Sequence, residues 1–103
     1  MQYSCIAVTS ASIRTSLSCT SWKLLEAGKM TDTIAALAKM NNTRKAREVI
    51  WMARDLLGGN GILLDHHVIR HMADIESIHS YEGTETVQTL LVGRDITGVS
   101  AFT

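Results

Sequence analysis

The chain has 103 residues, enough for one domain with a modest core. Its ten basic and ten acidic residues cancel, so it lacks the broad charged surface that nucleic acids or anionic membranes attract. It contains no proline, which permits long uninterrupted helices, and no apolar run approaches the roughly 20 residues that span a bilayer. We therefore expect one all-α domain over residues 1–103 that binds neither nucleic acid nor membrane.

The cysteine pattern favours a reducing compartment. Cys5 and Cys19 have no second pair and no histidines nearby, so neither a structural zinc site nor a disulfide framework is indicated. The Ser/Thr-rich first thirty residues contain one arginine, Arg14, which is a poor match to an Arg-rich targeting helix.

Two helices are predicted in the first half of the chain. Helical spacing of Ile6, Ile13, Leu17 and Leu24 predicts a first helix that ends near Gly28. A second, of about 27 residues, begins after a Thr31 cap and ends at Gly58-Gly59. The expected stripe of this second helix is Ile34, Leu37, Ala38, Asn41, Lys45, Val49, Met52 and Leu56.

A weak helix-forming patch, Asn41, Asn42 and Thr43, interrupts that stripe. It either faces solvent or marks a buried polar contact, and the solvent-facing alternative is the one we expect.

The segment GGNGILL, Gly58 to Leu64, is a loop that ends the long helix or presses bare amides against a ligand. A short helix from Asp65 to about Met72 follows, with Asp65 as its cap. His67 and His71 lie four residues apart on it, a spacing that can chelate zinc. The expected third-ligand candidates are the loop residues Asp74, Glu76 and His79, but simple packing or exposure explains the histidines better, and no metal is expected.

The turn before the last apolar segment carries the most chemistry. Tyr81, Glu82 and Gly83 precede Thr84, whose hydroxyl suits a helix cap, and Glu85 follows where the helix dipole favours an anion. From spacing alone, Glu82 is either a solvated glutamate or a positioned base. The tail from Gly93 has too many glycines for a long helix and ends near an aromatic, Phe102, that needs packing.

Four motifs then occur in a fixed order: LLGGNG at residues 56–61, HVIRH at 67–71, YEGT at 81–84 and GRDITGVSAF at 93–102. Together with NNTRKAREV at 41–49, they resemble the C-terminal end of the acyl-CoA dehydrogenase family, and most closely its glutaryl-CoA dehydrogenase and short-chain acyl-CoA oxidase branch. The resemblance begins near Leu17 and leaves residues 1–16 unmatched. It implies an up-and-down helical bundle, incomplete at its N-terminus.

The resemblance also implies a function, an FAD enzyme that oxidises the bond between the α and β carbons of an acyl-CoA. It implies that Glu82 removes the α proton while hydride passes to flavin, and that Tyr81 and Gly83 line the substrate site. Thr84 and Phe102 match positions that contact FAD. The positions matching a loop that meets the FAD of a neighbouring subunit are Asp55, Leu56, Leu57, Gly58 and Gly59, which implies a homo-oligomer, either a dimer or a tetramer.

Two departures bear on these expectations. Glu85 and Thr86 stand where relatives often carry His or Tyr followed by Asp, and a second buried acid near Glu82 would raise the pKa of one of the two, whereas a solvent-facing Glu85 would not. The family's N-terminal helical and β domains have no counterpart here, so the alternative is a non-catalytic helical oligomerisation module. The implied location is the mitochondrial matrix in a eukaryote or the cytoplasm in a bacterium.

Overall fold

In the computed structural model, which describes residues 19–101, the chain is built from helices and turns and contains no strand within that range. Residues 19–26 are helical. The elements that follow are α2 (Asp32–Leu56), the 3-10 helices η1 (Gly58–Ile62) and η2 (Leu64–His66), α3 (Val68–Ser80) and α4 (Glu85–Thr97). The all-α prediction is confirmed.

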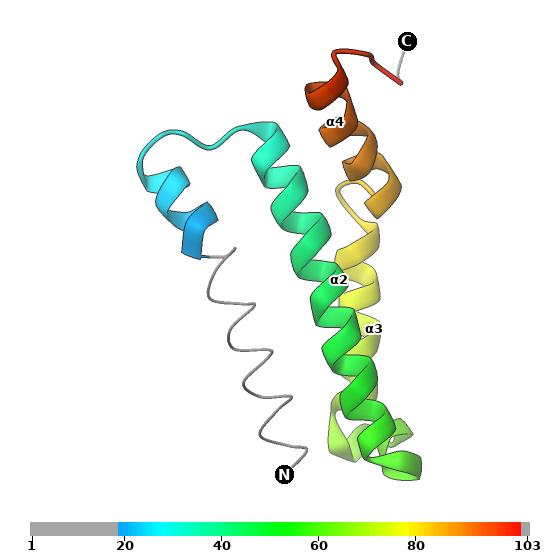
Figure 1. Ribbon diagram of the computed structural model, residues 1–103. Helices are drawn as coiled ribbons and strands as arrows, with labels where there is room; N and C mark the ends of the chain where they lie inside the picture. Colours follow the sequence, from blue (N-terminus) through cyan, green and yellow to red (C-terminus); the bar gives the residue numbers. More distant parts are fainter. Residues whose placement is uncertain (1–18, 102–103) are drawn as a thin grey trace.

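The helices are arranged up and down. Figure 1 shows α2 running down to the lower end of the molecule, while α3 and then α4 return upward beside it, with the end of α4 rising above the start of α2. The second half of α2 therefore packs on α3 and its first half on α4. The turn between α3 and α4 is held against the upper half of α2.

The ends of the long helix follow from local chemistry, as predicted. Thr31 accepts a hydrogen bond from the Ile34 amide at 3.3 Å, and Asp32 occupies the first turn. At the other end Gly58 has a φ of +56°, the left-handed conformation typical of the residue that follows a helix. The predicted end near Gly28 is confirmed too, since this glycine has a φ of +66° and the Lys29 amide bonds back to the Leu24 carbonyl. The predicted positions Ile6, Ile13 and Leu17 lie outside the described residues.

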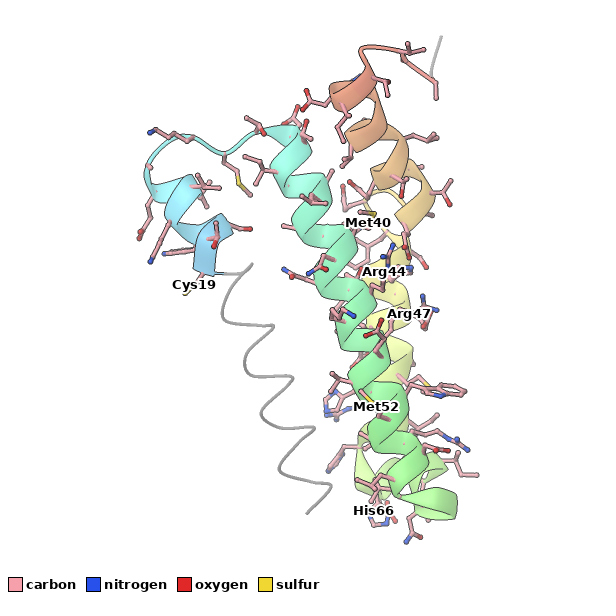
Figure 2. All side chains as sticks on the ribbon, in the orientation of Figure 1. Cys19, Met40, Arg44, Arg47, Met52 and His66 are labelled. Carbon is pink, nitrogen blue, oxygen red and sulfur yellow. The ribbon has the colours of Figure 1, made fainter. Side chains whose placement is uncertain are left out.

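The predicted apolar stripe of α2 is buried only in part. Ala38 is buried, but Leu37, Met52 and Leu56 are exposed. Thr43, Arg44 and Arg47, which bond to α3 and α4, lie outside the stripe. Met40, Arg44 and Arg47 follow one another along the side of α2 that contacts these helices (Figure 2). The solvent-facing interpretation of the Asn41–Thr43 patch was also wrong for Thr43, which is buried and hydrogen-bonded to His79.

The predicted helix from Asp65 to Met72 is wrong at both ends. Asp65 lies in η2, and α3 begins only at Val68 because His67 adopts a left-handed φ of +62° that interrupts the helix. The helix then continues to Ser80, since Ile69, Met72, Ile75 and His79 place a partly buried stripe at helical spacing. Asp74, Glu76 and His79 are therefore helical and not in a loop.

The tail from Gly93 forms no long helix, as predicted, but its first residues belong to α4. This helix passes through Gly93 and ends at Thr97, where Gly98 takes a φ of +72°. A single glycine costs only about 1 kcal/mol in a helix interior, which the rest of the helix tolerates.

The described part of the chain buries little apolar surface. Within residues 19–101 the buried hydrophobic residues are Ala36 and Ala38, and the buried polar ones are Thr43 and Gln88. Large side chains remain accessible on several elements, among them Trp22, Leu25, Trp51, Leu63, Leu64 and Ile96. The described residues therefore include many accessible apolar side chains and only a small buried core.

Candidate functional site

The turn between α3 and α4 has an unusual backbone. Tyr81 is extended at the end of α3, and the next two residues are left-handed, with φ of +55° at Glu82 and +93° at Gly83. Thr84 then caps α4 by accepting a hydrogen bond from the Val87 amide at 3.4 Å, as predicted. A left-handed glutamate is uncommon, because its Cβ crowds the backbone in this conformation. Neighbouring contacts must therefore hold it there.

Glycine is required at position 83. A Cβ built there would lie 2.6 Å from Gln88 Nε2, and the φ of Gly83 is one that other residues resist. The Gln88 amide occupies that space because it donates to the carbonyls of Glu82, at 2.9 Å, and Gly83, at 3.3 Å. The glycine thus leaves room for the Gln88 side chain of α4 to pack against the turn that precedes this helix.

The side chains of Tyr81 and Glu82 are both exposed in the single chain. The Lys39 ammonium lies 5.6 Å from the centroid of the Tyr81 ring, close enough for a cation–π contact. Lys39 also donates to the carbonyls of Tyr81 and Gly83. Lys39 therefore holds the turn against α2, while the side chains of Tyr81 and Glu82 are exposed to solvent.

The second acid, Glu85, is committed to an ion-pair cluster on the other side of the turn. Arg44 donates to it through both Nε, at 2.9 Å, and Nη2. The hydrogen bond from Arg44 lowers the pKa of Glu85 despite some desolvation, and the charges of Arg44, His79 and Arg47 lower this pKa further. Glu85 is thus an ionised partner of α2.

His79 joins this cluster from α3, with 12% of its side chain exposed. Its Nδ1 lies 2.9 Å from the Thr43 hydroxyl, which in turn donates to the Lys39 carbonyl. Its Nε2 lies 3.3 Å from Arg47 and 3.2 Å from Glu85. A neutral ring accepts from Arg47, whereas a protonated ring donates to Glu85. Arg47 also pairs with Glu76 at 2.6 Å, so α2 and α3 are joined by charge.

An open depression lies beside this cluster, on the side of α4. Its lining residues are His79, Ser80, Thr84, Glu85, Thr86, Thr89 and Leu90. Glu82 is not among them, so the described surface around that carboxylate offers little shelter from water.

The structure does not bring the remaining candidate residues to the turn. Asp55, Leu56, Leu57, Gly58 and Gly59 lie at the far end of α2. The 16 residues from Lys39, which contacts the turn, to Asp55 span about 24 Å of helix. Phe102 lies outside the described residues. One chain therefore presents two separate groups of candidate residues.

The histidines predicted to be possible metal ligands are arranged differently. His67 stands at the left-handed start of α3, and His71 lies 3.9 Å from Asp74 in an exposed pair. Residues 19–101 contain no group of three or more His, Cys, Asp or Glu side chains placed to hold a metal ion. No helix in the same range is long and apolar enough to cross a membrane.

Comparison with known proteins decides the family. Residues 6–97 match the sequence model for "Acyl-CoA dehydrogenase, C-terminal domain". The chain belongs to this family of oxidoreductases. The match begins at residue 6, whereas the motif resemblance begins near Leu17. The domain division stays a prediction.

Two curated proteins are similar to this chain over 73 residues. A short-chain-specific acyl-CoA dehydrogenase of Clostridium acetobutylicum is 37% identical over 73 residues, which are 71% of this chain and 19% of that protein. An NADH-dependent acryloyl-CoA reductase of Anaerotignum propionicum is 30% identical over 73 residues, covering 71% of this chain and 18% of the relative. The chain thus spans about a fifth of their length.

Solved structures agree with the assignment. A glutaryl-CoA dehydrogenase from Mycobacterium smegmatis aligns with a TM-score of 0.81 and 38% identity, over 84% of this chain and 22% of that one. A glutaryl-CoA dehydrogenase from the same organism in complex with FADH2 aligns with a TM-score of 0.80 and 34% identity, over the same shares of the two chains.

Sequence reasoning missed four residues that shape the turn and its surroundings. Lys39 and Gln88 hold the turn, while Arg44 and His79 engage Glu85. Lys39 and Arg44 offered no local signal, because their partners lie more than forty residues away. His79 was considered only as a metal ligand.

Proposed function

We propose that this chain acts as the C-terminal domain of an FAD-dependent acyl-CoA dehydrogenase resembling glutaryl-CoA dehydrogenase, with Glu82 as the base. The main support for the proposal is the Tyr81–Thr84 turn, in which Glu82 has a left-handed backbone conformation. The turn lies within the part of the chain that matches the family. A base that removes a proton from carbon must be held in a fixed geometry, and this backbone supports that role.

A carboxylate alone is not sufficient for this reaction. A proton next to a thioester is weakly acidic, so a base must be desolvated and the developing enolate charge must be stabilised. Bound FAD would supply the acceptor for the hydride that leaves the β carbon. Glu82 would take the α proton, while Tyr81 and Gly83 would lie beside the acyl chain. Since Glu82 is exposed here, its desolvation would come from bound substrate and from other parts of the enzyme.

The far end of α2 fits a role in holding FAD from a neighbouring subunit. Gly58 and Gly59 are exposed, and no atom lies within 4 Å of a Cβ built on either, so their backbone is open to a ligand. Asp55 and Leu56 are exposed beside them. Because this end lies about 24 Å along α2 from Lys39, which contacts the Glu82 turn, we assign it to a second active site in a homo-oligomer, a dimer or a tetramer. Thr84 and Phe102 would contact the FAD of the first site.

Substitution of Glu82 tests the proposed base. In the assembled, FAD-loaded enzyme that contains this chain, we expect Glu82→Gln to abolish exchange of the acyl-CoA α proton with solvent deuterium and to leave acyl-CoA binding largely intact. Mass spectrometry of the recovered thioester measures the exchange. Glu48→Gln, at an exposed carboxylate paired with Lys45, is the matched control and should exchange normally. Unchanged turnover in Glu82→Gln would remove this residue as the base.

A non-catalytic helical oligomerisation module is the second candidate. The observation that favours it is the large apolar surface that a single chain leaves exposed. The two candidates differ in flavin content, because a module would associate through its helices without FAD. An assembly purified with native partners that lacks any flavin absorbance would support the module.

A further inference from the structure

Three consecutive carbonyl groups, those of Tyr81, Glu82 and Gly83, converge on only two side chains. Lys39 bonds to the first and third, and Gln88 to the second and third. We propose that Lys39 and Gln88 are positioning residues, which hold the Glu82 backbone so that its carboxylate points at the reacting carbon. This inference rests on the proposed role of Glu82 as the base.

Lys39 reaches the turn from the middle of α2, across 42 to 44 residues of sequence. Its ammonium donates to the Gly83 carbonyl at 2.5 Å and to the Tyr81 carbonyl. Within residues 19–101 it forms no ion pair with a carboxylate, unlike Arg44, Lys45 and Arg47. Hydrogen bonds from a charged donor are roughly twice as strong as neutral ones. The positive charge of Lys39 is therefore directed at the turn.

Gln88 reaches the same carbonyls from one turn inside α4. It is 7% exposed, and its Nε2 donates to the carbonyls of Glu82 at 2.9 Å and Gly83 at 3.3 Å. Burying an amide is unfavourable unless its polar atoms are hydrogen-bonded, so this side chain is matched to the carbonyls it meets. An apolar residue of the same length would fill the space but leave both carbonyls without this donor.

The two donors act on the conformation that sets the direction of Glu82. A left-handed residue followed by a left-handed glycine is unfavourable for a glutamate in isolation. Without Lys39 and Gln88 the adjoining peptide groups are free to rotate to more ordinary angles, which would swing the Cα–Cβ bond of Glu82. A shift of about 1 Å in a reacting group can slow catalysis by about 100-fold.

The test uses Lys39→Met and Gln88→Met in the assembled, FAD-loaded enzyme. Methionine matches glutamine in length, is one atom shorter than lysine, and removes the donors at both positions. We expect turnover per bound FAD to fall about 10- to 100-fold in each variant, while the acyl-CoA dissociation constant changes by less than about threefold. Lys39→Arg keeps a charged donor and should recover turnover relative to Lys39→Met. Lys45→Met, on the same helix but paired only with Glu48, should behave as the parent enzyme.

A double variant separates positioning from a general loss of stability. If Lys39 acts through Glu82, Lys39→Met should cause no further loss of residual turnover in a Glu82→Gln background, because the two effects are not additive. Normal kcat per FAD in both methionine variants, or a full additional loss in the double variant, would refute the positioning role. A Glu82→Gln enzyme with normal turnover would instead refute the proposed function, so the two failures are distinguishable.

Discussion

An added methyl group would meet very different surroundings at two glycines. A Cβ at Gly61 would lie 2.3 Å from the Arg54 carbonyl oxygen, because η1 folds closely back onto the last turns of α2. At Gly93, inside α4, nothing lies within 4 Å of the added atom. The first glycine therefore serves packing, whereas the second only weakens its helix.

These surroundings predict opposite effects of the same substitution. We expect Gly61→Ala to destabilise the chain by about 1–3 kcal/mol, since backbone atoms must move apart. Gly93→Ala should stabilise it by about 0.5–1 kcal/mol, because alanine loses less conformational freedom in a helix. Urea unfolding followed by circular dichroism at 222 nm compares the two variants with the parent chain. Equal effects at both positions would contradict the assigned close approach at Gly61.

At the scale of elements, charge joins α2 to α4 and makes that contact sensitive to acid. The Arg44 hydrogen bond holds the pKa of Glu85 below its usual 4.5, so the folded state favours the ionised carboxyl. The stabilisation is fully present above about pH 4.5 and is lost as the pH falls through the lowered folded-state pKa. The groups facing Glu85 are Arg44, Arg47 and His79.

The expected result is a stability difference between the parent chain and Glu85→Gln that is largest near neutral pH and disappears in strong acid. Urea midpoints measured from pH 3 to pH 7 give this difference directly. Glu48→Gln serves as control, because its pair with Lys45 lies within one helix and does not join α2 to α4. If the stability difference stayed constant from pH 3 to pH 7, the charge of Glu85 would not contribute to stability, and only its packing would.

The ends of the helices could be predicted from sequence wherever a local capping interaction determines them. Thr31, Thr84 and Gly58 mark helix ends by chemistry within a few residues, and each prediction is confirmed. The start of α3 was missed because a left-handed histidine has no clear sequence signal. The polar contacts of α2 with α3 and α4 were also missed, since hydrophobic periodicity marked Ala38, which is buried, together with Leu37, Met52 and Leu56, which are exposed in the described residues.

The candidate site was predictable only in part. The YEGT turn could be recognised as a family motif, which named Glu82 and its neighbours. The donors that hold this turn could not, because Lys39 lies in a different helix and no local pattern links it to residue 83. The FAD and substrate roles of the named residues stay predictions, and so does the cellular location.

For the whole molecule, the small buried core limits what one chain can do. Large side chains such as Trp51, 60% exposed, and Ile96, 79% exposed, stay mostly uncovered within residues 19–101. Burial of such side chains provides most of the favourable free energy of folding. Within the described residues the side chain of Glu82 is also exposed.

We therefore expect the purified 103-residue chain to be helical but to bind FAD weakly or not at all. Circular dichroism measures the first property, and titration with FAD followed by gel filtration and absorbance measures the second. The assembled enzyme provides the positive control for flavin retention. A stable yellow protein with one FAD per chain would overturn this expectation.

The left-handed backbone of Glu82 has an evolutionary consequence. Such a conformation costs a glutamate about 1–3 kcal/mol, whereas glycine adopts it freely. Mutational drift in a copy released from catalysis should therefore readily accept glycine at this position, since the fold benefits from the change. A glutamate at this position therefore costs the fold stability that a glycine would not, and the proposed role as base would require this cost.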